Sequence, residues 1–185
     1  MMTARIATNN TLVYDYVSSA AEASVLLLGK GCGAMNDINT LIAIDAIKRV
    51  KAAYFRCMDR REWEEFATLF MEDAVFDVRG ALEMPRPDEE YDEEPITGVS
   101  AIVDYVRTGL TPLISVHYGH MPEIELIDAD NARGTWPMHD ILVAPPSAPF
   151  KIFRGWGHYW ETYRKTDGRW KIATLRLRRL YVESE

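Results

Sequence analysis

The segment DINTLIAIDAIKRVKAAYFRCMDRR, residues 37–61, carries the clearest periodic pattern in the chain. Its apolar residues recur every three to four positions, which is typical of an amphipathic α-helix. Asp37 can cap the start of this helix, and Arg60 and Arg61 suit its C-terminal end, where cations interact favourably with the helix dipole. The pattern therefore predicts one long helix over this segment.

Beyond this helix, the chain first continues with helical patterns and then changes to alternation. A second apolar helix pattern has Trp63, Phe66, Leu69 and Phe70 on one side. A short alternating strand then covers residues 74–78, and a third helix opens at Gly98 and Ser100. Four antiparallel strands follow, near residues 115–127, 133–144, 152–166 and 169–183. Asp167-Gly168 between the last two predicts a tight hairpin. This order predicts an α+β fold, with three N-terminal helices packed on a curved, mainly antiparallel sheet.

The length of 185 residues fits one domain with a full core. Residues 1–36 lack this periodicity, and we expect an N-terminal extension that is either mobile or in contact with another subunit. Residues 37–185 then form the folded domain. Seven acids and one base lie between Glu83 and Pro95, so this run carries most of the net charge of −7 and predicts a solvated loop.

Several classes of protein and site are disfavoured. No basic stripe could follow a nucleic acid, and the longest apolar run, residues 23–29, is too short to cross a membrane. We read no export signal and expect a cytoplasmic location. Cys32 and Cys57 are too few for a disulfide framework, and no Cys/His cluster offers a metal site. Gly155-Trp156-Gly157 indicates a strand bend or bulge, since no phosphate-binding loop pattern is present.

His117 and Asp59 are the first candidates for chemistry. Strand alternation places His117 on one face with Ser115, and either a catalytic or a structural hydrogen-bonded histidine fits this position. Asp59 lies at a helix C-terminus, where the dipole disfavours an anion, so it needs a partner or points to water beside Arg60. Tyr54 and Asp59 are about 140° apart on an ideal helix, and can share one cavity only if the helix unwinds near Asp59.

Asp140 and Arg179 are further polar residues in apolar surroundings. Asp140 shares a strand face with Trp136 and Met138, and we expect it to be partly buried with a raised pKa. Arg179 shares a face with Leu177, so its guanidinium must find an anion, either in the protein or in a ligand.

Five pieces of the chain resemble one family. They are the segment Tyr54–Asp59, the run from Trp63 to Val75, Gly98, the segment His117–Ile124, and the hairpin Asp167–Trp170. Together they resemble the SnoaL-like branch of the nuclear transport factor 2-like superfamily, from about Ile38 to Glu183. The segments at residues 54–59 and 117–124 are most similar to those of bile acid 7α-dehydratases. Scytalone dehydratases and lindane dehydrochlorinases resemble the chain more distantly.

This resemblance implies a cone-shaped α+β barrel without a cofactor. It also implies a homo-oligomer, with a trimer favoured over a dimer. The catalytic residues of the bile acid dehydratases correspond to Tyr54, Asp59, His117, Asp140 and Arg179, and all five residue types are kept. The implied activity is that of a lyase that eliminates water from a small, hydroxylated, hydrophobic polycycle such as a steroid.

The resemblance also suggests a role for each residue. His117 would act as general base, Asp59 would hold its tautomer, and Tyr54 would donate a hydrogen bond to developing oxyanion charge. Asp140, if protonated, would help the hydroxide leave. Arg179 would pair either with Asp140 or with an anionic group of the substrate.

Three further residues are expected to contact the substrate, namely Trp136, Tyr118 and Met138.

Two other functions fit the same five catalytic residues. One is an isomerase, cyclase or dehydrohalogenase with the same base, and the other is the non-catalytic small subunit of an aromatic-ring dioxygenase. The acidic loop, the Pro-rich loop at residues 145–149 and the N-terminal extension depart from the family pattern, so the sequence names no substrate.

Overall fold

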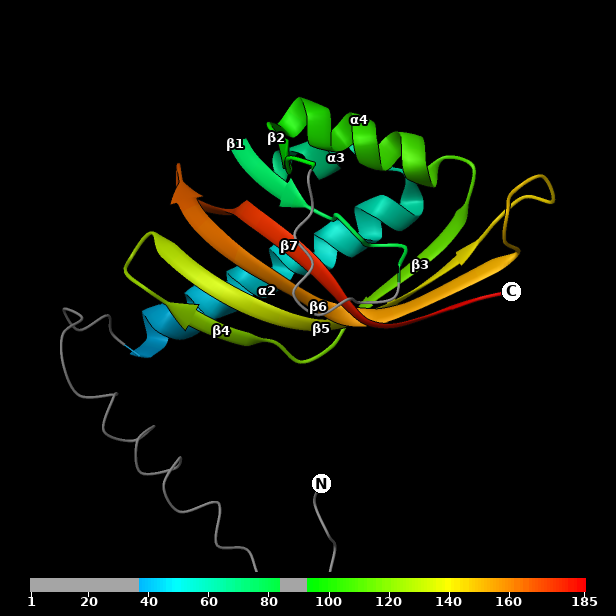
Figure 1. Cartoon of the computed structure of the whole chain (residues 1–185). Coiled ribbons are helices and arrows are strands. Elements are labelled where there is room, and N and C mark those ends of the chain that lie inside the picture. The colour runs from blue at the N-terminus through cyan, green and yellow to red at the C-terminus, as the bar shows by residue number, and fades with distance from the viewer. Residues whose placement is uncertain (1–36, 84–92) are drawn as a thin grey trace, which may run out of the picture. The chain divides into compact units, whose positions relative to one another are not determined.

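The computed structural model describes residues 37–83 and 93–185. The predicted extension and most of the acidic loop lie outside the described residues. Within them the helices are α2 (Asp37–Arg60), α3 (Trp63–Thr68) and α4 (Val99–Leu110). The predicted long helix is therefore confirmed. Helix α2 lies along the concave face of the sheet, and α4 packs on α3 (Figure 1).

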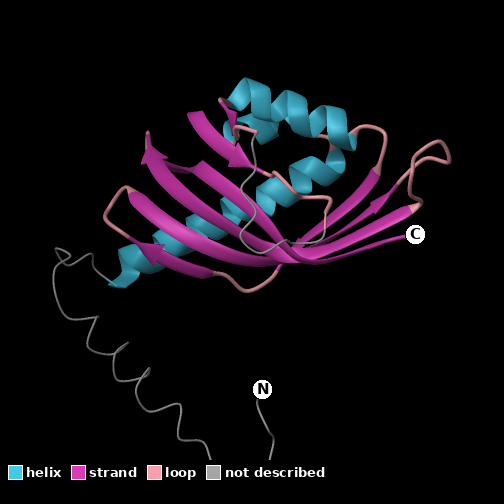
Figure 2. Cartoon of the chain, viewed as in Figure 1, coloured by secondary structure: helices cyan, strands magenta, loops and turns pink. Residues whose placement is uncertain are grey.

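One curved sheet of seven strands forms the rest of the domain. Its strands are β1 (Phe70–Asp77), β2 (Ile96–Thr97), β3 (Ile114–Gly119), β4 (Glu123–Leu126), β5 (Asn131–Val143), β6 (Ile152–Thr166) and β7 (Arg169–Ser184). Their order is β2-β1-β7-β6-β5-β3, and β4 also pairs with β5. The β1–β7 pair is parallel and the others are antiparallel. Figure 2 shows the sheet curving around α2 without closing, so the expected α+β fold is confirmed as an open cone.

Two predicted elements differ from the structure. The strand expected over residues 115–127 is two strands, β3 and β4, which pair with different halves of β5. The interruption contains Pro122, whose nitrogen cannot donate to a neighbouring strand. The second helix ends at Thr68, and Phe70 already begins the parallel pairing of β1 with β7.

The last two strands carry the predicted turn and the predicted bulge. Asp167 and Gly168 have φ values of 51° and 74°, as a tight hairpin turn requires. In the pairing of β6 with β7, the register shifts just before Gly157 and leaves Leu180 as an extra, exposed residue. A Cβ on Gly157 would lie 2.2 Å from the carbonyl oxygen of Arg178, so only glycine fits this approach.

None of the helices in the described part of the chain has the length and hydropathy that a membrane crossing requires.

We expect Asp77→Asn to lower the free energy of unfolding at pH 7 by about 2 kcal/mol. Asp77 accepts hydrogen bonds of 2.9 Å from both Arg79 and Arg178. Burial alone would raise its pKa, but these bonds outweigh burial and lower the pKa to about 2 from an ordinary 3.8. Because the folded value is the lower one, the stabilisation is present above pH 4 and is lost as pH falls toward 2.

Urea denaturation of wild type and variant at several pH values checks this. The difference in stability should shrink between pH 4 and pH 2, and a difference that stays constant with pH would contradict the assignment.

Candidate functional site

Asp59 and His117 meet at the end of α2. The Nδ1 atom of His117 lies 2.6 Å from Oδ1 of Asp59, and the backbone N–H of His117 donates to Oδ2 at 2.9 Å. The hydroxyl of Ser115 donates to Oδ1 at 3.0 Å. These donors give Asp59 the partners that an anion at a helix C-terminus needs. Since Nδ1 is bound to Asp59, Nε2 is the nitrogen that is left for chemistry.

Arg61 follows the end of α2 and links it to the end of α4 and the start of β3. Its φ of 63° breaks the helical path, and its guanidinium donates to the carbonyls of Leu110 at 2.8 Å and Leu113 at 2.5 Å. It also donates to the Ser115 hydroxyl at 2.9 Å. Burial lowers the pKa of Arg61, and the nearby Asp59 carboxylate opposes this shift.

Helix α2 continues past Asp59 to Arg60 without unwinding. Tyr54 and Asp59 therefore do not face one cavity together, which the sequence allowed only for an unwound helix. Instead Asp59 reaches His117 from the side, and Tyr54 and Met58, one helical turn apart, face the cavity. Asp59 itself is not among the lining residues. The carboxylate therefore acts on the cavity only through His117.

Asp140 and Arg179 form a buried, two-pronged ion pair. The Nη1 and Nη2 atoms of Arg179 donate to the two carboxylate oxygens of Asp140 at 3.0 and 2.7 Å. Both side chains are almost fully buried, and Arg179 Nε donates to the carbonyl of Ala81 at 2.7 Å. The structure thus decides between the two alternatives for Arg179, which pairs with Asp140.

Strand register places this pair beside the histidine. His117 on β3 lies directly opposite Asp140 on β5, and Asp140 in turn lies opposite Gly155 on β6. Oδ2 of Asp140 is 4.0 Å from Nε2 of His117. Gly155 lets the ion pair cross β6 to reach Arg179 on β7, because no side chain fills the space above it.

We expect Gly155→Ala to destabilise the protein by about 1–3 kcal/mol, the usual cost of overpacking. The new Cβ would lie 2.5 Å from Arg179 Nη1 and 2.9 Å from Asp140 Oδ1, and must push the ion pair apart. Gly109→Ala on α4 is the control, because nothing lies within 4 Å of its Cβ and alanine is the better helix former. Equal stability of the two variants in urea denaturation would contradict this account.

A cavity of about 610 Å³ opens beside His117, a size suited to a small molecule. Polar groups gather where Tyr54, His117, Asp140, Tyr159 and Arg179 meet. The other walls are largely apolar and include Met58, Phe76, Val78, Ala81, Leu82, Val106, Leu110, Leu113, Leu142 and Leu177. This combination suits a hydrophobic ligand that presents one reactive group to the histidine.

Two buried tyrosines supply hydroxyl groups to this cavity. Burial raises the pKa of Tyr54 well above its usual value, and the neighbouring Tyr159 adds to the shift. Burial likewise raises the pKa of Tyr159. Both therefore stay neutral phenols, which donate hydrogen bonds. The sequence does not single out Tyr159, although the alternation of β6 does place it on the same face as Gly155.

Three residues that were expected to contact the substrate do not line the cavity. Tyr118 is half exposed and stacks on His139 with ring centroids 4.6 Å apart. Trp136 is buried and donates to the Tyr163 hydroxyl at 2.9 Å. Met138 lies behind the ion pair, with its sulfur 3.3 Å from Arg179. The predicted substrate contacts are therefore not supported, because Tyr118 lies on the solvent face, Trp136 is bonded to Tyr163 in the core, and Met138 is buried against Arg179 without lining the cavity.

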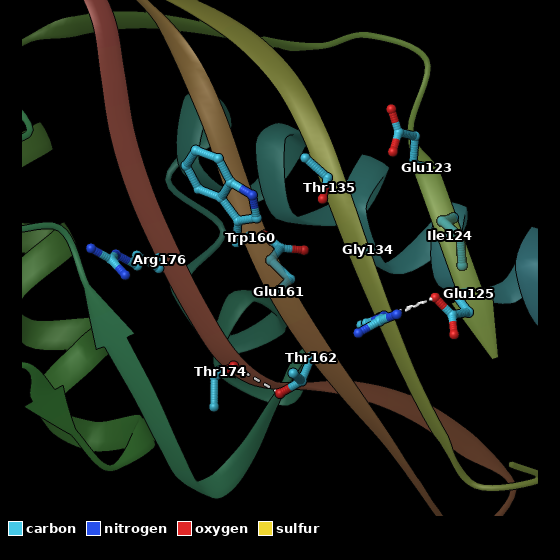
Figure 3. A pocket seen from close by; sticks show the side chains of 11 residues that line it. Glu123, Ile124, Glu125, Gly134, Thr135, Trp160, Glu161, Thr162, Thr174 and Arg176 are labelled. Carbon is cyan, nitrogen blue, oxygen red and sulfur yellow. Dashed lines mark hydrogen bonds and ion pairs between the residues drawn. The ribbon is translucent and has the colours of Figure 1, made fainter. Parts of the chain in front are cut away.

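A second hollow, of about 620 Å³, lies over strands β4 to β7 (Figure 3). Two pairs of its polar side chains bond to each other, Arg133 with Glu125 at 2.6 Å and Thr162 with Thr174 at 2.7 Å, and Glu161 is held by Lys51 from outside the hollow. No histidine or cysteine is among its described lining residues. Size does not separate the two hollows, but the histidine and the two tyrosines favour the first as the candidate active site.

Known proteins match this chain in sequence and in fold. A family model described as a SnoaL-like domain matches residues 39–176. A probable cyclase from Gibberella zeae is 25% identical over 138 residues, which cover 73% of this chain and 89% of that protein.

The solved structures that share the fold include two from Novosphingobium species. A candidate scytalone dehydratase from Novosphingobium aromaticivorans has a TM-score of 0.67 and 22% identity, covering 81% of this chain and 92% of that one. A hexachlorocyclohexane dehydrochlorinase from Novosphingobium barchaimii has a TM-score of 0.67 and 20% identity, covering 81% and 94%.

Proposed function

The chain belongs to the SnoaL-like family, and we propose that it is a cofactor-independent lyase that removes water from a hydroxylated, hydrophobic polycycle such as a steroid. The 2.6 Å bond between His117 Nδ1 and Asp59 carries this proposal. It leaves Nε2 as the basic nitrogen at the wall of a largely apolar cavity. A base in this position can remove a carbon-bound proton.

The first step is proton transfer from carbon to His117. The carbon lies next to a carbonyl group of the substrate, which accepts the electron pair of the broken C–H bond as oxyanion charge. Tyr54 and Tyr159 donate hydrogen bonds to this charge, and one well-placed donor is worth about 3–4 kcal/mol. The Asp59 carboxylate stabilises the imidazolium that forms, and Asp140, 4.0 Å from Nε2, adds a second negative charge.

The second step breaks the C–O bond. The electron pair returns from the oxyanion to form the carbon–carbon double bond, and the hydroxyl leaves with the C–O pair. His117 gives its proton to the departing hydroxyl when both groups lie on one face of the substrate, so that water is released and the base is restored.

Asp140 was expected to supply this proton, and the geometry does not favour that role. Both of its oxygens accept hydrogen bonds from Arg179, so neither points freely toward a leaving group. We assign the ion pair to holding Asp140 beside the imidazolium. Because Arg179 is also the one arginine or lysine among the described lining residues, the cavity favours an uncharged substrate.

A panel of hydroxysteroids, terpenoids and polyketide-like compounds tests the proposal. Ligands are found by thermal shift, and each hit is incubated with enzyme and analysed by mass spectrometry. A product lighter by one water supports dehydration. A product of unchanged mass would replace the lyase with an isomerase or cyclase, and loss of hydrogen halide from a halogenated analogue would indicate a dehydrohalogenase.

The isomerase, cyclase and dehydrohalogenase alternatives use the same base. Because the similar proteins include a probable cyclase and a dehydrochlorinase, the panel tests for these reactions too. A non-catalytic oxygenase subunit fits less well. Such a subunit would need no cavity beside His117, whereas here the histidine lines one of about 610 Å³.

A further inference from the structure

Lys51 is a fully buried cation that the proposed reaction does not yet use. It lies one turn before Tyr54 on α2, and its side chain is inaccessible to solvent. Its ammonium donates to Glu161 on β6, whose side chain is also fully buried. Glu161 accepts a second hydrogen bond from the Tyr163 hydroxyl, so the carboxylate is held from two sides.

The ammonium also lies against aromatic rings. Lys51 Nζ is 3.6 Å from the ring centroid of Tyr159, 4.0 Å from that of Tyr54 and 4.8 Å from that of Phe55. The two closest rings belong to the tyrosines that line the cavity. The Lys51 ammonium therefore contacts the ring faces of Tyr54 and Tyr159, the two tyrosines that line the cavity near His117.

Stability alone is a weak reason for this arrangement. A buried ion pair is often no more stabilising than apolar residues of the same volume, because both charges must be taken out of water. A cation on an aromatic face, by contrast, is attracted by the electron density of the ring and favours added negative charge there. The Lys51 ammonium should therefore favour negative charge on the side chains of Tyr54 and Tyr159.

We propose that Lys51 is a positioning residue that fixes the rings of Tyr54 and Tyr159 and makes their hydroxyls stronger hydrogen-bond donors toward oxyanion charge in the cavity. This role rests on the proposed function, but the polarisation of the phenols can be measured without any substrate. Burial lowers the pKa of Lys51 to about 8, while the Glu161 carboxylate opposes the shift. Loss of the ammonium proton above this pH should therefore weaken the effect.

The groups that face Lys51 bear on any such pH dependence. Glu161, Tyr159 and Tyr163 face it from β6, and Tyr54 lies on its own helix. Because burial raises the pKa values of all three tyrosines, these side chains stay neutral phenols near neutral pH.

The test places 3-fluorotyrosine at position 159 and follows its fluorine chemical shift from pH 6 to 9, where the buried phenol stays neutral and Lys51 loses its proton. The wild-type signal should move with a midpoint near pH 8, as the ammonium becomes neutral, and in Lys51→Met this step should be absent. Lys51→Arg keeps its charge over this range, so its signal should stay close to the low-pH position of wild type. Lys48→Met, an exposed lysine on the same helix, should leave the midpoint unchanged.

Lys51→Met alone leaves Glu161 without its cation, so the double variant Lys51→Met/Glu161→Gln keeps the test valid if the single variant does not fold. The pH-dependent step should be absent there too, because the cation that contacts both rings is gone. A wild-type signal with no step, or a step that persists in the Lys51→Met variant that folds, would overturn the proposal. A step that depends on Lys51, with no substrate found in the panel, would sink the proposed lyase and leave the polarised phenols standing.

Discussion

His117→Ala is expected to lower kcat by about 10²–10⁴-fold on a substrate that the wild type dehydrates, the usual contribution of a general base. Among the described residues that line the cavity, His117 is the one with an imidazole, and its Nε2 is not held by Asp59. Ligand affinity should change little, since the apolar walls that bind a hydrophobic compound remain in place. Steady-state kinetics and thermal shift with the same ligand separate the two effects.

His120→Ala provides the matched control. This histidine is exposed and bonds to His139, away from the cavity lining. Its removal should leave kcat within about twofold, as expected for a surface change. Wild-type turnover in His117→Ala, or an equal loss in both variants, would remove His117 from the mechanism.

Asp59→Asn is expected to lower kcat by about 10²–10⁴-fold, because it reverses the tautomer of the base. The Oδ2 position receives the backbone N–H of His117, which can only donate, so the amide oxygen must occupy that position. The amide NH₂ then faces Nδ1 of the ring. Nδ1 becomes an acceptor, the ring proton moves to Nε2, and the base that faces the cavity is lost.

Nitrogen NMR of the imidazole checks this without a substrate. In wild type, we expect Nδ1 to carry the proton at high pH, and in Asp59→Asn we expect Nε2 to carry it. Ser115→Ala is the control, because it removes one donor to Asp59 but leaves the carboxylate facing Nδ1. An unchanged tautomer in Asp59→Asn would contradict the assigned role, even with reduced activity.

Local patterns account for most of the correctly predicted fold. The three-to-four spacing before Arg61 defines α2, and Asp167-Gly168 has the backbone freedom that the last hairpin needs. Local sequence patterns gave the wrong helix end where a contact with a distant strand determines it. Helix α3 stops at Thr68 because Phe70 pairs with β7, a strand about 100 residues later in the chain, and no local spacing contains that information.

The candidate site was predictable in part. Residue types and the family resemblance identified Tyr54, Asp59, His117, Asp140 and Arg179, and the structure brings these five together. The same reasoning missed Tyr159 and Lys51, which look like an ordinary core ring and a surface cation in sequence. It also assigned Tyr118 to the cavity, although strand alternation places this neighbour of His117 on the opposite face of β3.

The sequence by itself determined the elements that depend on neighbours in the chain, namely the long helix, the hairpin, the irregular pairing at Gly157 and an arginine that must meet an anion. Only the tertiary structure decided which anion that is, and which nitrogen of His117 faces the cavity. The physical reason is distance along the chain. His117 and Asp59 are 58 residues apart and Arg179 and Asp140 are 39 apart, so strand register and sheet curvature alone bring them within hydrogen-bonding reach.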